Sequence, residues 1–160
     1  MPTTTTVDSI DAKILAALTE EPRATVIALA DKTGVSRNTV QARLGKLEKQ
    51  GVLQSFERRI DPGALGYPLT AFILTSVTQR KLTRIADALD DVPEVVEVHG
   101  LSGATDLLVH VVARDADDLY RIAGRILDID GVEQTTTSLV MRKLVDYRVT
   151  QLLTSLANPS

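Results

Sequence analysis

The chain contains 160 residues, of which 44% are apolar and only 3% aromatic, and its formal net charge is −3 at pH 7. This length suits one ordinary domain or two small ones, and the apolar fraction is high enough for a packed core. The absence of cysteine excludes a disulfide framework and a thiolate zinc site, and two histidines are too few for a histidine-rich metal cage. Scarce aromatic residues and no tryptophan argue against a base-stacking platform for single-stranded nucleic acid.

The N-terminal end carries a threonine run at residues 3–6, which we expect to fray. It has neither the positive start nor the apolar stretch of a signal peptide, and no apolar run in the chain is as long as a membrane span. We therefore expect a cytoplasmic protein with no membrane partner.

A first helix should begin after the threonine run, where Asp8 or Ser9 can serve as its N-cap. Pro22 marks its end. Its apolar residues recur at the spacing of one helix face, and they are Ile10, Ile14, Leu15 and Leu18.

Two further helices should follow with a tight turn between them. The second covers 25–33, and Gly34 suits the left-handed residue that closes it. Ser36 can cap the third helix, which stops at Gly51. The predicted buried residues are Val26, Leu29 and Ala30 in the second helix and Val40, Leu44 and Leu47 in the third. Three short helices joined in this way match a helix-turn-helix.

Charge is distributed unevenly along the chain. Residues 1–60 carry a net charge of +2 and residues 61–160 a net charge of −5, and within 32–59 the balance is +5. Such a local basic segment is typical of a nucleic-acid contact surface. The alternating run at 52–60 predicts a strand, and the Pro/Gly-rich run at 61–68 predicts a linker.

Beyond the linker the sequence repeats itself. The segment 82–95 aligns with 119–132 at a constant offset of 37 residues, and each copy predicts a helix flanked by strands. The result is a βαββαβ, ferredoxin-like domain over 69–147, followed by a C-terminal tail at 148–160. The expected strands are 69–77, 95–101, 106–113 and 132–142. The fold class is therefore α+β, with a winged-helix-like helix-turn-helix domain over 1–60 before the ferredoxin-like domain.

Two of these strands are apolar on both faces. In 106–113, Leu107, Val109 and Val111 share one face while Leu108 and Val112 flank His110 on the other, and 69–77 has the same character. Two helices can cover only one face of a four-stranded sheet. The other face needs a partner, most simply a second copy of the chain related by a two-fold axis.

Four stretches together resemble the Lrp/AsnC, or feast/famine, family of transcription regulators. They are "DAKILAAL", "LADKTGVSRNTVQARLGKLEKQGVL", "IDPGALG" and "GLSGATDLLVHV", in the family's order and spacing over roughly 8–147. The resemblance implies an N-terminal helix-turn-helix that binds double-stranded DNA and a ferredoxin-like domain that dimerises. It also implies assembly of dimers into larger multimers, commonly octamers, and an amino-acid effector bound between subunits.

The third helix is the expected DNA reader, although pattern alone also fits a solvated basic face. Its capped N-terminus suits a phosphate, and residues of its first turns would meet base edges in the major groove. Arg43 could contact a guanine or a phosphate. The more distal basic residues, Lys49 among them, are expected to contact the sugar-phosphate backbone of DNA. The candidate DNA-binding residues are Ser36, Arg37, Asn38, Thr39, Gln41, Arg43, Lys46, Arg58 and Arg59.

The loop at 99–106 has two interpretations. It can be an ordinary hairpin turn with glycines at positive φ, in which Asp106 accepts hydrogen bonds from backbone donors. In the family, this loop borders the effector pocket, where a carboxylate could meet the ammonium group of an amino acid and amides and hydroxyls its carboxylate. The candidate effector-binding residues are Leu101, Ser102, Gly103, Ala104, Thr105, Asp106, Thr135 and Thr137.

Two other functions remain open from the residues alone. One is an architectural DNA-binding protein without an effector, and the other is a metabolic enzyme subunit with a ferredoxin-like domain. The enzyme is disfavoured because the chain has no phosphate loop and Ser102 has no histidine and aspartate arranged to activate it. His99 and His110 read as ordinary strand residues. We therefore expect no catalytic residue, no metal site and no cofactor apart from the amino-acid effector.

Overall fold

The computed structural model describes residues 6–157 and divides into two compact units. The first, called the N-terminal unit below, comprises the chain up to Arg58 together with the segment from Val145 onward. The second, called the sheet unit, is Arg59–Leu144. Of the threonine run expected to fray, all but Thr6 lies outside the described residues.

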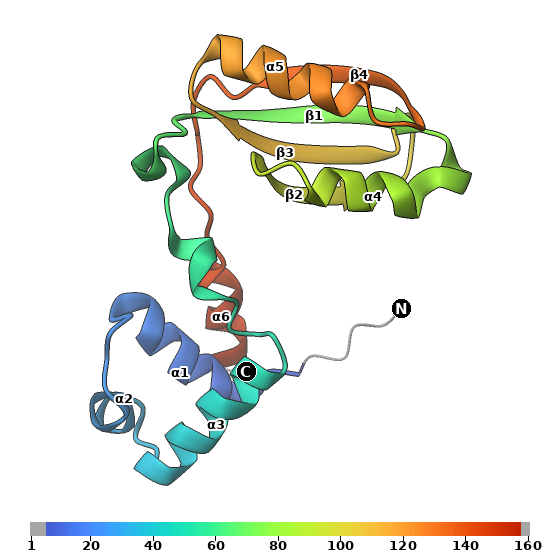
Figure 1. The fold of residues 1–160 in the computed structure, drawn as a ribbon. Coiled ribbons are helices and arrows are strands. Elements are labelled where there is room, and N and C mark those ends of the chain that lie inside the picture. Colours follow the sequence, from blue (N-terminus) through green and yellow to red (C-terminus); the bar gives the residue numbers. More distant parts are fainter. Residues whose placement is uncertain (1–5, 158–160) are drawn as a thin grey trace. The chain divides into compact units, whose positions relative to one another are not determined.

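The predicted helices of the N-terminal unit are confirmed, with α1 at Ser9–Glu20, α2 at Val26–Thr33 and α3 at Arg37–Lys49 (Figure 1). Asp8 caps α1 in a capping box with Asp11, since each side chain accepts a hydrogen bond from the other residue's backbone N–H. Thr25 and Ser36 cap α2 and α3 in the same side-chain-to-backbone manner. Between them Gly34 has a φ of 71°, the left-handed conformation that ends α2 and turns the chain into α3.

The core of this unit forms where the apolar faces of the three helices meet. Its buried members are Ile14, Ala17, Leu29, Ala30 and Val40. Leu47, which is also wholly buried, continues the buried face of α3. The helical spacing of apolar residues in the sequence therefore identified the buried face of each helix, except that Leu15 is only half-buried and outside this cluster.

The prediction of a strand at 52–60 is wrong. Val52 and Leu53 donate their backbone N–H groups to the carbonyl of Leu47, which terminates α3. The segment then forms a short 3₁₀ helix, η1, at Phe56–Arg59, and a second one, η2, follows at Pro62–Leu65 in the predicted linker. A strand needs a neighbour for its backbone groups, and no strand of the described chain pairs with this run. Alternating polarity alone misled the prediction.

The sheet unit has the predicted βαββαβ order. Its elements are β1 at Leu69–Val77, η3 at Gln79–Lys81, α4 at Leu82–Asp90, β2 at Val95–Gly100, β3 at Leu107–Ala113, α5 at Ala116–Leu127 and β4 at Val132–Leu139. The strands form one antiparallel sheet in the order β2-β3-β1-β4 (Figure 1). This is the ferredoxin-like arrangement expected from the repeat.

Both helices cover the same face of the sheet. Alternate residues of β1 and β3, among them Ile73 and Val109, pack with Ile85 of α4 and Ile122 of α5 in one buried cluster. The opposite face carries side chains that are only partly covered, including Phe72 and Leu74 of β1 and Leu108 and His110 of β3. From Thr70 to Val77, burial along β1 alternates, as one covered and one open face require.

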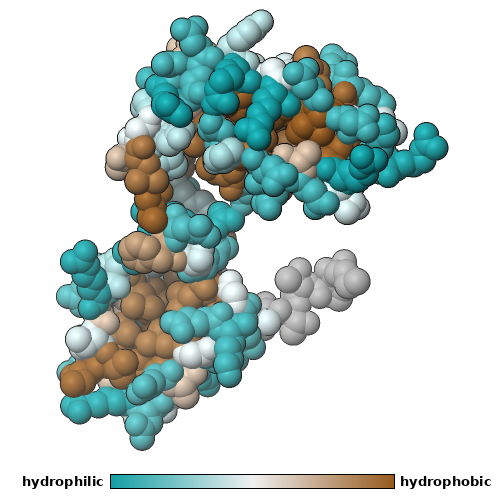
Figure 2. All heavy atoms as spheres, viewed as in Figure 1, coloured by the Kyte–Doolittle hydropathy of each residue, from teal (hydrophilic) through white to brown (hydrophobic). Residues whose placement is uncertain are grey.

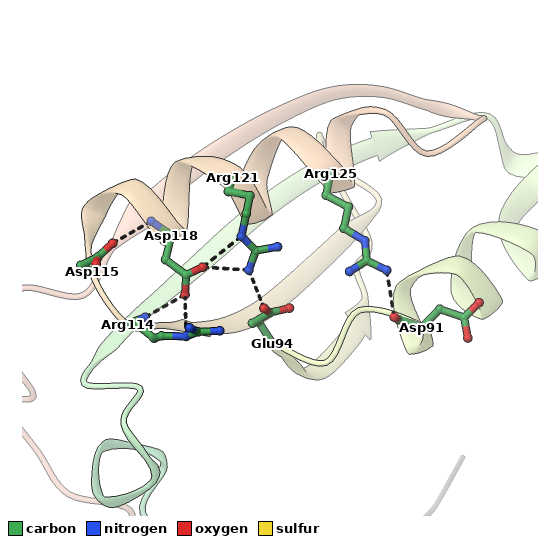
Figure 3. A network of polar contacts seen from close by, with 7 residues as sticks. All are labelled: Asp91, Glu94, Arg114, Asp115, Asp118, Arg121 and Arg125. Carbon is green, nitrogen blue, oxygen red and sulfur yellow. Dashed lines mark hydrogen bonds and ion pairs between the residues drawn. The ribbon is translucent and has the colours of Figure 1, made fainter.

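A network of polar contacts fixes α5 against the start of β2 and the end of α4 (Figure 3). Arg121 Nη2 donates to Glu94 Oε1 at 2.5 Å and to Asp118 Oδ1 at 2.8 Å. Arg125 Nη2 donates to the carbonyl oxygen of Asp91, the residue that ends α4, at 3.1 Å. Glu94 is buried, so its pairing with Arg121 compensates a carboxylate that has left water.

The C-terminal segment is not a separate tail. Thr150–Ala157 forms a helix, α6, which belongs to the N-terminal unit and packs against α1 (Figure 1). Its residues Leu153 and Leu156 are half-buried, while Leu152 is exposed. Figure 2 shows that apolar surface remains visible on this unit between polar side chains. The apolar residues at the end of the sequence therefore form a helix that packs against α1.

Candidate nucleic-acid interface and effector region

The N-terminus of α3 is held by its cap. The Oγ of Ser36 accepts a hydrogen bond from the N–H of Thr39 at 3.2 Å, and the two hydroxyl oxygens lie 2.8 Å apart. Arg37 and Asn38 are exposed in the first turn of the helix. Ser36 and Thr39 thus shape the helix start, while the two residues between them face solvent.

The outward face of α3 is lined by small and polar residues. A shallow depression of about 460 Å³ lies along it, lined by Gln41, Ala42, Gly45, Lys46, Lys49 and Gln50. This face lies opposite the buried residues Val40 and Leu47. It combines two lysines with two amide side chains, which can contact phosphates and base edges respectively.

Arg43 turns away from this face toward α1. Its Nη1 contacts Asp8 Oδ2 and lies 3.1 Å from Oδ1 of Asp11, a wholly buried carboxylate. Lys46 Nζ lies 3.6 Å from the other oxygen of Asp11. The backbone N–H of Asp11 and the guanidinium of Arg43 together lower the pKa of Asp8. Arg43 therefore links α3 to α1, a contact with residues more than thirty positions away that no local pattern reveals.

Arg58 and Arg59 lie in η1, at the point where the N-terminal unit gives way to the sheet unit. Both are exposed. They are not on α3, so their contribution to a DNA surface stays a prediction from the sequence.

The loop at 101–106 is tied to the end of β1 by Asp106. The Leu101 N–H donates to the Asp106 carbonyl at 2.8 Å, and the Asp106 N–H donates to the Thr75 carbonyl at 3.0 Å. The two side-chain oxygens of Asp106 accept from the Val77 N–H and from Nε2 of Gln79, both at 2.8 Å. Gly103 has a φ of 124°, so the turn needs glycine there. Gln79 is a participant that sequence reasoning missed.

The threonines of β4 reach the same end of β1 from its other side. Thr135 pairs in register with Thr75, and Thr137 with Ile73. Because cross-strand partners share a face, both threonines belong to the helix-covered side of the sheet. Thr135 is half-buried and Thr137 exposed. Thr75 therefore stands between the loop and the β4 threonines, and it is a buried polar residue that the sequence did not single out.

The exposed part of the loop comprises Leu101, Ser102, Gly103 and Ala104, and Thr105 is half-buried. A second depression, of about 230 Å³, lies between α4 and β2 and includes none of these residues.

Among residues 6–157 no group of histidine, cysteine, aspartate or glutamate side chains could hold a metal ion. Within the same residues, none of the helices combines the length and the apolar character needed to cross a membrane.

Comparison with known proteins assigns both units. Residues 7–54 match the winged helix-turn-helix DNA-binding family, and residues 70–150 match the Lrp/AsnC ligand binding domain. The HTH-type transcriptional regulator FL11 of Pyrococcus horikoshii is 36% identical over 135 residues, which are 84% of this chain and 89% of that protein.

Solved structures agree with this assignment. Escherichia coli AsnC superposes with a TM-score of 0.80 at 25% identity, covering 90% of this chain and 98% of that one. The feast or famine regulatory protein of M. tuberculosis, solved in complex with L-methionine, superposes with a TM-score of 0.78 at 27% identity, covering 89% and 97%. The chain therefore belongs to the Lrp/AsnC family, and it is a transcription regulator that joins a helix-turn-helix to an Lrp/AsnC ligand-binding domain.

Proposed function

We propose that this regulator acts in the cytoplasm as a multimer, binds promoter DNA through α3, and responds to an amino acid held at a boundary between subunits. It works by binding rather than by catalysis. The observation that carries the proposal is the arrangement around Thr75, where the loop at 101–106 and the β4 threonines approach one strand end from opposite sides.

The chemistry of that strand end suits a zwitterion. Each side-chain oxygen of Asp106 accepts one hydrogen bond, and a carboxylate oxygen has a second acceptor position that an ammonium group can use. The exposed loop from Ser102 to Ala104 supplies backbone amides and the Ser102 hydroxyl for the ligand's carboxylate. A charged ligand that leaves water needs partners for both of its charges. The L-methionine complex of the mycobacterial relative supports an amino acid as the class of effector.

Dimerisation is supported by the open face of the sheet. Phe72, Leu74 and Leu108 lie there with His110, and the rings of Phe72 and His110 have their centroids 4.8 Å apart. An apolar sheet face is stable when a second layer covers it, and a second copy of the chain is the simplest layer. Larger assemblies, such as octamers of the kind the family commonly forms, would be built from these dimers.

For DNA, the proposal assigns the outward face of α3 to the major groove. Arg37 and Asn38 are exposed in its first turn, and Gln41 and Lys49 line the outward face farther along. Arg58 and Arg59 are assigned to the phosphate backbone. Arg43 differs from these candidates, because its contacts with Asp8 and Asp11 give it a structural role in the unbound protein. Lys46 shares that role in part, since its Nζ lies 3.6 Å from Asp11.

A calorimetric titration of the full chain with each of the twenty amino acids, starting with L-methionine, tests the effector. We expect saturable binding of at least one of them, with an affinity that changes when a selected duplex DNA is present, because coupling between two ligands is reciprocal. If none binds at millimolar concentration while DNA binding persists, the chain is an architectural DNA-binding protein instead.

A further inference from the structure

Gly45 stands in the interior of α3, where glycine is normally unfavourable. Glycine loses more backbone freedom on folding than alanine does, and a helix interior offers no conformational need for it. Gly45 lies four residues from the C-terminal end of the helix, not at a cap, and its φ is not in the left-handed region. Its conformation therefore gives no reason for a glycine.

Packing gives no reason either. Apart from the adjoining residues and the helix's own backbone, a Cβ atom added at Gly45 would meet no atom of the described residues within 4 Å. By contrast, a Cβ at Gly131 would meet Ile85 Cδ1 at 2.9 Å, so glycine is required at that position for close packing. At Gly45 the neighbouring space is open solvent, and nothing in the described part of the chain explains the missing side chain.

The open space is the depression on the outward face of α3. Ala42, one turn earlier, lines it together with Gly45, and the surrounding side chains are Gln41, Lys46, Lys49 and Gln50. These rim residues can contact base edges and phosphates. The surface of α3 is therefore lowest at Ala42 and Gly45, and the side chains around these two residues are ones that can contact DNA.

We propose that Gly45 is an affinity- and specificity-determining residue of the DNA interface, because the missing side chain lets the backbone of α3 approach the floor of the major groove. This rests on the proposed binding of DNA by α3. A helix with its side chains is about 10–12 Å across and the major groove about 12 Å wide, so a small residue on the facing side decides how deeply the helix sits. Deep seating brings the amide of Gln41 within reach of base edges and Ala42 against thymine methyl groups.

Gly124 provides a matched control in the same chain. It lies in the interior of α5, is exposed, and an added Cβ there would also meet no described atom within 4 Å. It belongs to the sheet unit rather than to the DNA-binding helix. Replacing either glycine by alanine should therefore have the same effect on helix stability, and only one of the two should affect DNA.

The experiment compares Gly45→Ala and Gly124→Ala in the full chain. Both variants should unfold at a higher temperature than the wild type, by roughly 3–6 °C, because alanine favours the helix. The DNA probe is a duplex selected by the wild-type protein from a random pool. Its affinity, measured by fluorescence anisotropy, should fall about tenfold in Gly45→Ala and stay unchanged in Gly124→Ala, since a good base contact is worth about that much.

The outcomes separate this inference from the function on which it rests. Wild-type affinity in Gly45→Ala would overturn the role of Gly45 and leave DNA binding by α3 intact. Failure of the wild type to select any duplex would overturn the proposed function itself. The salt dependence of binding should be the same in wild type and Gly45→Ala, because no charge is removed. A changed slope would mean that the substitution disturbs phosphate contacts, which would also contradict the proposal.

Discussion

The guanidinium Nη1 of Arg43 lies 3.1 Å from Oδ1 of Asp11, whose side chain is wholly buried between α1 and α3. Arg43→Ala would leave this carboxylate with the N–H of Asp8 and the more distant Lys46. We expect the variant to lose about 1–3 kcal/mol of unfolding free energy, the usual result of removing a charged partner from a buried group. Urea denaturation followed by circular dichroism measures it. Arg37→Ala, on the exposed first turn of the same helix, is the control and should unfold like the wild type.

Lys49 should act on DNA through charge alone. It is exposed on the outward face of α3 beside the depression. Lys49→Ala should weaken binding to all duplexes by a similar factor and reduce the slope of log affinity against log salt by about 1. Anisotropy titrations at several salt concentrations give the slope. An unchanged slope would remove Lys49 from the phosphate contacts.

Asp106 should couple loop order to ligand binding. Asp106→Ala removes the acceptors for Val77 N–H and for Gln79, so the loop at 101–106 should loosen and amino-acid binding should be lost. Gln79→Ala removes only one of these bonds and should retain binding with a modest loss of stability, about 1 kcal/mol. Calorimetry on both variants decides the matter, and equal ligand affinity in Asp106→Ala and wild type would mean that the ligand binds elsewhere.

Stability should fall when His110 becomes protonated in the unfolded chain. Burial on the open sheet face lowers the pKa of His110 below its ordinary value of 6.5, with Glu97 opposing the shift and His99 adding to it. The folded protein therefore binds fewer protons than the unfolded chain just below pH 6.5, and the contribution of neutral His110 is lost as the pH falls from 6.5 toward the folded pKa. His110→Asn should flatten the stability profile in this window. A profile identical to that of the wild type would show that other groups dominate it.

The open face should fail as an interface when it carries a charge. Phe72→Glu puts a carboxylate among Leu74, Leu108 and His110, and a buried unpaired charge costs several kcal/mol, so the full chain should sediment as a monomer. Tyr120→Glu is the control, because that side chain is 84% exposed on α5 and away from this face. A wild-type chain that already sediments as a monomer would contradict the proposed dimer.

Local patterns in the sequence predicted most of the fold. Ser36 marks a helix start and Gly34 a left-handed turn, and both depend only on local chemistry. The alternation of burial along β1 follows from the single covered face of the sheet. The run at 52–60 was mistaken for a strand because pairing is a long-range property that alternation does not report.

The candidate sites were less predictable for the same reason. Arg43 looked like a DNA contact because its partners Asp8 and Asp11 are distant in sequence and adjacent only after α1 packs on α3. The face occupied by Thr135 and Thr137 depended on the register of β4 with β1, which the sequence did not specify. A role for Gly45 could not be predicted from the sequence, because a missing side chain gives no motif.

The docking of α6 on α1 makes the N-terminal unit discontinuous in sequence, because the sheet unit is inserted between its two segments. An inserted unit is joined to the rest of the chain by two covalent connections, one at each end of its own sequence. The chain therefore connects the sheet unit to the DNA-binding helices at both of its ends. Cutting the chain once, anywhere between η2 and β4, should therefore leave the DNA-binding helices with both of their sequence segments but without a continuous path between them.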